Sequence, residues 1–169
     1  MLDKDNLTDT LRNFARYVIS QSRANLTRQK KNVSGDLYSS LDYDLKVMPN
    51  SFSLAFLMQE YGVFQDQGVS GTKVKYNTPF SYRDKQPPQK DILKWVRARR
   101  IRFRNEQGQF TQGTFNSIAY VIARSIKEKG IKPSLFFTKP FDKAFRDLPD
   151  DFIESFGLDV EEFLKFTIK

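Results

Sequence analysis

Apolar residues near the start of the chain recur at steps of three and four, with arginines placed between them. This spacing predicts a long amphipathic helix over about the first 28 residues. Its apolar face would contain Leu7, Leu11, Phe14, Ala15, Val18, Ile19, Ser22 and Leu26. A short second helix is predicted after a polar run, with Ser34 as its N-cap and Asp36 in its first turn.

The next segment alternates between apolar and polar residues, which is the period of a half-buried β-strand. In "DYDLKVM" (42–48) Tyr43, Leu45 and Val47 alternate with charged residues, and in "FSLAFLM" (52–58), after a "PNS" turn, the large apolar residues Phe52, Leu54, Phe56 and Met58 form the next alternating set. Proline, asparagine and serine favour turns. The two runs therefore predict an antiparallel hairpin.

Residues 61–89 contain glycines and prolines and few periodic apolar positions, so we expect a long extended loop there. Helical spacing resumes near Gln89 and again over 114–129, where Gly130 is expected as the C-cap. "IKPSLFF" reads as a short extended segment. After "PFDKAF", helices are expected in two apolar and acidic pieces, 152–156 and 160–166.

This order of elements predicts an α+β fold. The long N-terminal helix and the further helices would pack on a small, mainly antiparallel sheet. We expect one domain over residues 1–148 and an acidic C-terminal extension, also helical, over residues 149–169.

Composition limits the chemistry that this chain can perform. It contains no cysteine and no histidine, which excludes disulfides, thiolate metal sites and a Ser-His nucleophile pair. Glu60 and Asp66 are the only acids near the glycine-rich stretch, which is weak support for a metal site or for acid–base catalysis. We therefore expect no enzyme activity, no catalytic or metal-binding residues and no cofactor.

The stretch "QEYGVFQDQGVSGTK" (59–73) invites comparison with a phosphate-binding loop. A Walker-type loop needs four residues between its glycines, followed by Lys-Ser/Thr and a helix. Gly68 and Gly71 have two residues between them, and the residues after Lys73 look extended. We interpret Gly62, Gly68 and Gly71 as positions where the chain turns sharply and passes close to another backbone.

The net charge of +8 is unevenly distributed. Residues 73–104 carry 11 basic and 2 acidic side chains, a net of +9, while residues 140–169 carry 4 basic and 8 acidic, a net of −4. Arginines interleaved with aromatic rings suit phosphate backbones, stacked bases or acidic protein surfaces. Candidates for contact with DNA or with an acidic partner are Lys94, Arg97, Arg99, Arg100, Arg102 and Arg104.

Three segments resemble the tail-completion and neck proteins of tailed phages, in matching order over residues 5–147. "VSGDLYSSL" (33–41) resembles a family signature between the long N-terminal helix and the hairpin, and "YGVFQDQGVSGT" (61–72) resembles the Tyr-x-x-x-x-Asp/Glu-x-Gly stretch after it. "IARSIKEKGIKPSLFFTKPFDKAF" (122–145) resembles the closing pattern of a helix, a glycine, a Pro-containing segment with Phe-Phe and a final helix. The long loop, the basic helix predicted over 90–104 and the acidic tail depart from the family pattern.

The resemblance implies a non-enzymatic virion protein at the head–tail junction, forming a homo-oligomeric ring of about six or twelve copies around the DNA channel. Its expected partners are other neck, portal or tail proteins, with non-specific contact to genomic DNA. We expect subunit contacts at Tyr61, Gly62, Phe64, Asp66, Gly68, Val69, Gly71, Phe136 and Phe137. The alternative is a soluble nucleic-acid-binding protein that uses residues 90–104.

The expected location is the virion, assembled in the host cytoplasm. The N-terminus is charged and helical in pattern, unlike a signal peptide, and no apolar run reaches the length of a membrane span. We therefore expect no contact with a membrane.

Overall fold

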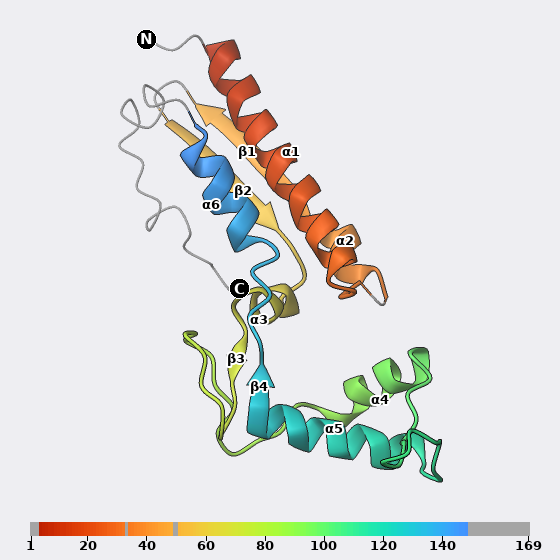
Figure 1. Ribbon diagram of the computed structural model, residues 1–169. Coiled ribbons are helices and arrows are strands. Elements are labelled where there is room, and N and C mark those ends of the chain that lie inside the picture. Colours follow the sequence, from red (N-terminus) through yellow and green to blue (C-terminus); the bar gives the residue numbers. More distant parts are fainter. Residues whose placement is uncertain (1–3, 33, 49–50, 149–169) are drawn as a thin grey trace. The chain divides into compact units, whose positions relative to one another are not determined.

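The computed structural model describes residues 4–32, 34–48 and 51–148 (Figure 1). These residues form six helices and two two-stranded antiparallel sheets, which confirms the predicted α+β class. The chain divides into two compact units, where the sequence predicted one domain over 1–148. We call Met1–Asp66 with Leu135–Lys169 the hairpin unit, and Gln67–Ser134 the helix-pair unit.

The hairpin unit is built from the predicted long helix and hairpin. Helix α1 (Lys4–Arg28) and helix α6 (Thr138–Arg146) contact each other, and both lie on one face of the hairpin formed by β1 (Asp42–Met48) and β2 (Ser51–Leu57) (Figure 1). The register pairs Asp42 with Leu57 at one end and Met48 with Ser51 at the other. Along both strands, half-buried residues alternate with exposed ones, as the period-two pattern predicted.

Phenylalanine rings fill the core of the hairpin unit. Phe14 of α1 meets Phe141 of α6 with ring centroids 5.4 Å apart, and Phe56 of β2 meets Phe137 at 5.2 Å, both edge to face. Edge-to-face pairs of this kind add about 0.5–1.5 kcal/mol each beyond the burial of their area. The abundance of phenylalanine is therefore explained in part by internal packing between α1, β2 and α6.

Two short helices complete this unit. Helix α2 (Asp36–Ser40) buries Leu37 and begins after Gly35, which has φ +79° and no side-chain cap. The predicted N-cap, Ser34, instead accepts a hydrogen bond from the Asp36 N–H at 3.4 Å. Helix α3 (Tyr61–Gln67) occupies the start of the region predicted as a loop, so that prediction was wrong for residues 61–67.

The helix-pair unit consists of α4 (Gln89–Ala98) packed against α5 (Phe115–Lys129), with a small sheet of β3 (Val69–Ser70) and β4 (Gly130–Ile131). Thr114 and Ser117 form a capping box at the start of α5, and Gly130 is its C-cap, as predicted. Of the segment "IKPSLFF" (131–137), only Ile131 is in a strand, since β4 consists of Gly130 and Ile131.

The predicted basic helix over 90–104 ends early, at Ala98. Arg100 has φ +51°, and the N–H groups of Arg100 and Ile101 donate to the carbonyl oxygens of Arg97 and Val96. This is the hydrogen-bond pattern of a Schellman motif, with Arg100 in the position where glycine is usual. The motif turns the chain so that Ile101 and Phe103 pack back against the α4–α5 core.

Several predictions lie outside the described residues: Pro49 and Asn50 of the hairpin turn, and the two expected helices within 149–169. Among the residues that the structure describes, no helix is both long enough and apolar enough to cross a membrane.

Candidate functional site

Asp66 lies at the end of α3 and is fully buried. Its Oδ1 accepts hydrogen bonds from the backbone N–H groups of Phe137 (2.8 Å) and Thr138 (3.2 Å), and its Oδ2 accepts from the Thr138 hydroxyl. The carboxylate therefore caps the N-terminus of α6 from a distant part of the chain, where a negative charge suits the helix dipole. Burial raises the pKa of Asp66, and the hydrogen bonds from Thr138 and Phe137 offset part of that rise.

The glycines after α3 allow backbones to approach closely within the helix-pair unit. A Cβ atom at Gly68 would lie 2.5 Å from the Ile131 oxygen, and one at Gly71 would lie 2.2 Å from the Glu128 oxygen. Gly130 faces them, since its Cβ would lie 2.1 Å from the Val69 oxygen. The prediction that Gly68 and Gly71 pass close to another backbone is confirmed, and that backbone belongs to the same chain.

Gly62 is constrained by side chains, because a Cβ there would lie 2.8 Å from both Leu37 Cδ1 and Met58 Sδ. It thus brings α3 against α2.

Most of the predicted subunit-contact residues are internal. Their side chains or backbones are buried within their own units: Gly62, Asp66, Gly68, Val69, Gly71, Phe136 and Phe137. Phe136 and Phe137 belong to the phenylalanine core of the hairpin unit. Because packing inside the chain explains these seven residues, we do not retain them as interface candidates. The other two candidates are more accessible, since Tyr61 is exposed and Phe64 is half-buried.

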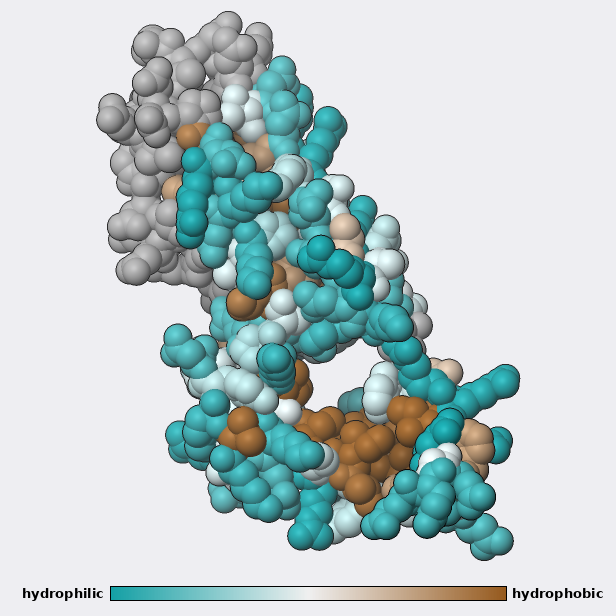
Figure 2. Space-filling view, in the orientation of Figure 1, coloured by the Kyte–Doolittle hydropathy of each residue, from teal (hydrophilic) through white to brown (hydrophobic). Residues whose placement is uncertain are grey.

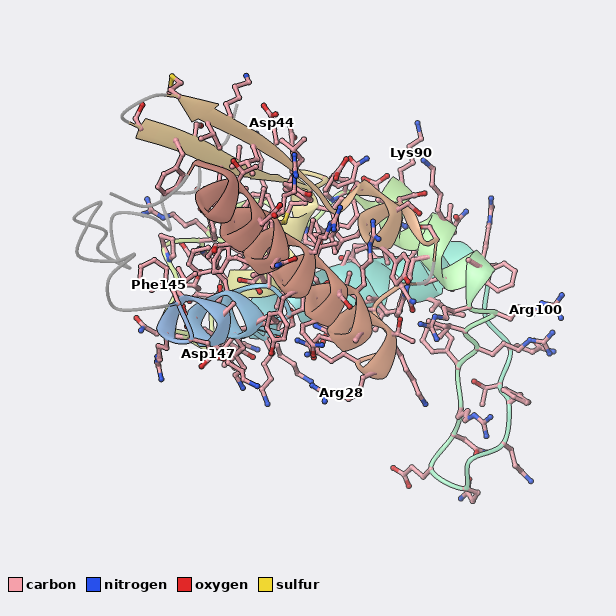
Figure 3. All side chains as sticks on the ribbon, turned by 90° about the horizontal axis from the view of Figure 1, so that it is seen from above. Arg28, Asp44, Lys90, Arg100, Phe145 and Asp147 are labelled. Atoms are coloured by element: carbon pink, nitrogen blue, oxygen red, sulfur yellow. The ribbon has the colours of Figure 1, made fainter. Side chains whose placement is uncertain are left out.

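The basic candidates do lie together on the surface of the helix-pair unit. Lys94 and Arg97 are on α4, and the remaining four follow it in the segment between α4 and α5. All six side chains are exposed. Figure 3 shows this segment, with Arg100 near its start. The guanidinium groups of Arg102 and Arg104 lie over the Phe110 ring, 5.7 and 4.3 Å from its centroid. Contacts of this kind contribute about 0.5–1 kcal/mol at exposed sites and hold the arginines at the surface.

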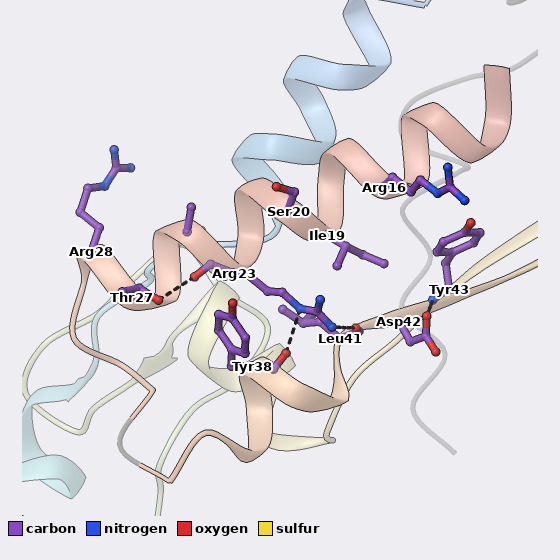
Figure 4. Close-up of a pocket in the computed structure, with 11 residues that line it drawn as sticks. Arg16, Ile19, Ser20, Arg23, Thr27, Arg28, Tyr38, Leu41, Asp42 and Tyr43 are labelled. Carbon is purple, nitrogen blue, oxygen red and sulfur yellow. Dashed lines mark hydrogen bonds between the residues drawn. The ribbon is translucent and has the colours of Figure 1, made fainter. Parts of the chain in front are cut away.

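Sequence reasoning missed a groove in the hairpin unit beside α1. It has a volume of about 720 Å³ and lies between α1, α2 and the start of β1 (Figure 4). Arg23 lines this groove and donates to the carbonyl oxygens of Tyr38 (3.1 Å) and Leu41 (2.8 Å), while its guanidinium lies over the Tyr38 ring. Arg23 therefore has a structural role, because it links α1 to α2. Its position between the apolar residues of α1 did not indicate this role in the sequence.

The groove lining also includes Arg16, Arg28, Asp42 and Tyr43. A single carboxylate among arginines and tyrosines suits binding of an acidic group better than proton transfer, which needs a positioned acid or base of matched pKa. In the described ranges, no three residues of the His, Cys, Asp or Glu type gather in a way that would hold a metal ion.

Comparison with known proteins gives no further guide, because no family profile, curated protein or solved structure matches this chain.

Proposed function

We propose that this protein is a structural subunit of a tailed-phage virion, forming a ring at the head–tail junction that joins portal-side and tail-side components around the DNA channel. The proposal rests on the resemblance of three sequence segments to tail-completion and neck proteins. The structure adds one observation that supports it, which is how those three segments meet.

The three segments contact one another through the residues that carry the resemblance. Gly62 of the second segment packs against Leu37 of the first, and Asp66 of the second caps α6 in the third through Phe137 and Thr138. Gly68 and Gly71 approach the α5–β4 backbone, which also belongs to the third. Short motifs that match a family by chance are not expected to contact one another in the folded chain. Motifs that specify a fold are expected to contact one another.

The chemistry of the described surface fits a non-enzymatic role. Its prominent features are exposed arginines, exposed apolar side chains and a groove with one carboxylate. These features are suited to binding other molecules. A contact of this kind that repeats between identical subunits can close into a ring, and sheet edges can contribute to it.

The experiment is to delete the gene from the phage that encodes this chain and to inspect the lysate by electron microscopy. We expect DNA-filled heads and separate tails, and we expect purified protein to restore joined, infectious particles. Mass spectrometry of wild-type particles should detect the chain, and a gold label on it should lie at the head–tail junction. Normal particles from the deletion phage, or particles without the chain, would contradict the proposal.

A second candidate function is nucleic-acid binding by the helix-pair unit. The observation that favours it is charge, because residues 67–134 carry 15 basic and 4 acidic side chains, a net of +11. If about six phosphates are neutralised, the logarithm of the DNA association constant should fall with the logarithm of salt concentration at a slope of about −5. Replacing Arg97, Arg99, Arg100 and Arg102 should then abolish DNA binding, and unchanged binding would exclude this function.

A further inference from the structure

Most of the large apolar side chains that are exposed among the described residues lie in the helix-pair unit. Of the ten large apolar side chains that remain exposed, five lie between residues 95 and 121: Trp95 (41%), Phe110 (60%), Phe115 (38%), Tyr120 (49%) and Val121 (50%). Figure 2 shows apolar side chains gathered in a continuous area over α4 and α5. Apolar side chains that gather on an exposed surface mark an interaction site.

The core of this unit is too small to cover the apolar residues of its helices. Five residues are buried between α4 and α5: Ile92, Val96, Ile118, Ala119 and Ala123. Leu93, Ile101, Phe103, Ile122 and Ile126 pack against them and stay only partly buried. Covering such side chains is worth about 25 cal/mol per Å² of apolar area removed from water, so a binding partner would gain from this surface.

Charge narrows the chemistry of that partner. The net charge of +11 over residues 67–134 includes the exposed arginines between Arg97 and Arg104, two of which lie over the ring of the exposed Phe110. A suitable partner is both acidic and apolar. DNA satisfies the charge, but a phosphate backbone leaves aliphatic side chains such as Val121 uncovered.

The C-terminal segment of this chain, residues 149–169, has the required composition. It carries six acidic and two basic side chains, a net of −4. Five of its nine apolar residues recur at four-residue steps, a spacing at which helical side chains are neighbours: Phe152, Phe156, Val160, Leu164 and Ile168. An amphipathic segment of this kind binds apolar grooves through residues at such steps.

We propose that residues 149–169 of one copy bind the α4–α5 surface of a neighbouring copy. The α4–α5 surface is defined by Trp95, Phe115, Tyr120 and Val121 with the arginines from Arg97 to Arg104. This inference rests on the proposed ring and names the contact that builds it. Each copy has one such segment and one such surface, so the contact is head to tail and closes into a ring when the rotation between copies allows. The 21 residues after Leu148 span about 30 Å as a helix and about 70 Å when extended.

The test exchanges the charges of the two partners in the full-length chain. In the segment variant, Asp150, Asp151, Glu161 and Glu162 become lysine; in the surface variant, Arg97, Arg99, Arg100 and Arg102 become glutamate. Sedimentation velocity at low and high salt measures assembly, and circular dichroism with Trp95 fluorescence checks that each variant is folded. We expect the wild type to assemble and to dissociate as salt increases.

Each variant alone should assemble at least about tenfold more weakly than the wild type, because like charges then face each other. Mixing the two variants should restore assembly, since the lysine segment then meets the glutamate surface and the native segment meets the native surface. As a second measurement, a synthetic peptide of residues 149–169 should dissociate the wild-type assembly, while a peptide of scrambled sequence should not.

Three results would overturn the inference: a monomeric wild type, variants that assemble like the wild type, or a mixture that fails to recover. Recovery in a chain with both exchanges but not in the mixture would place the contact within one chain and also overturn it. Loss of duplex DNA binding in the surface variant with unchanged assembly would assign the arginines to DNA instead. The particle experiment distinguishes the two proposals, because a chain found at the junction whose variants fail to recover contradicts only this inference.

Discussion

The buried carboxylate of Asp66 offers a sharp test of how the hairpin unit is held together. Replacing Asp66 with alanine removes the acceptor for three donors at the start of α6: two backbone N–H groups and the Thr138 hydroxyl. A buried donor without a partner costs about 1–3 kcal/mol, and loss of an N-cap costs about 1 kcal/mol. Since these effects overlap and are not additive, we expect Asp66→Ala to lower the free energy of unfolding by about 3 kcal/mol.

Asp66→Asn is the matched variant, because it keeps an oxygen for the two N–H groups and offers an amide to the Thr138 hydroxyl. It should lose less than about 1 kcal/mol. Asp44→Ala, at an exposed strand position where the carboxylate forms an ion pair with exposed Lys46, should change stability by less than about 0.5 kcal/mol. Urea unfolding followed by circular dichroism measures all three variants. Hydrogen exchange of the α6 amides locates the effect, and should accelerate in Asp66→Ala alone.

The pH dependence of the same variants gives an independent check. Burial raises the pKa of Asp66 in the folded chain. A carboxyl whose folded pKa is raised stabilises the fold below its unfolded pKa, and this contribution is lost as the pH rises through the folded pKa. The wild type should lose stability over that window relative to Asp66→Asn, which has no proton to release. Equal losses in the alanine and asparagine variants, or a loss below about 1 kcal/mol in Asp66→Ala, would refute the capping argument.

Three further predictions concern other parts of the chain. Gly130→Ala should lower the unfolding free energy of the helix-pair unit by more than about 3 kcal/mol, because backbone strain adds to the clash with the β3 backbone. Gly108→Ala is the control, since Gly108 has a similar φ but nothing within 4 Å of its Cβ position. It should lower the unfolding free energy by only about 1 kcal/mol. Trp95 fluorescence during urea unfolding measures both, and similar losses would contradict the role given to the close approach. Ser22→Ala should raise the unfolding free energy by about 1 kcal/mol, since its buried hydroxyl has no hydrogen-bond partner among the described residues; a loss of stability would contradict this account. The hydrogen bond and charge of Lys73 lower the pKa of Glu128, so the Glu128 contribution to stability is present above its unfolded pKa and is lost as the pH falls through the folded pKa. In an NMR titration the Glu128 midpoint should return toward its ordinary value in Lys73→Met, and an unchanged midpoint would be the contrary result.

The parts of the fold that the sequence predicted correctly are those with a local signal. Helical spacing located α1, α4 and α5, strict alternation located the hairpin, and Gly130 marked the end of α5. Each of these signals acts within a few residues of the element that it specifies. The α+β class followed from their order.

The parts that were missed depend on contacts between distant residues. Helix α3 has a glycine near its start and only seven residues, so its local helix propensity is poor. Its Asp66 caps α6 through Phe137 and Thr138, which follow it in the sequence by 71 and 72 positions. The sequence did not indicate that α4 ends at Ala98. Arginine is a good helix former, and the left-handed position after a helix, which Arg100 occupies here, is usually a glycine. The two units likewise depend on which distant segments pack together.

The sequence did contain a signal for an interaction surface, but it was in α5 and not in the glycine-rich stretch. Residues 118–123 read "IAYVIA", six apolar or aromatic residues in a row. A surface helix needs an apolar stripe about 100° wide, whereas such a run surrounds the helix. Ile118, Ala119 and Ala123 are buried in the core that α5 shares with α4, whereas Tyr120 and Val121 stay exposed, so α4 covers only part of the apolar surface of α5. An apolar run of this kind indicates a second partner for α5, which is the role that we propose for residues 149–169 of a neighbouring copy.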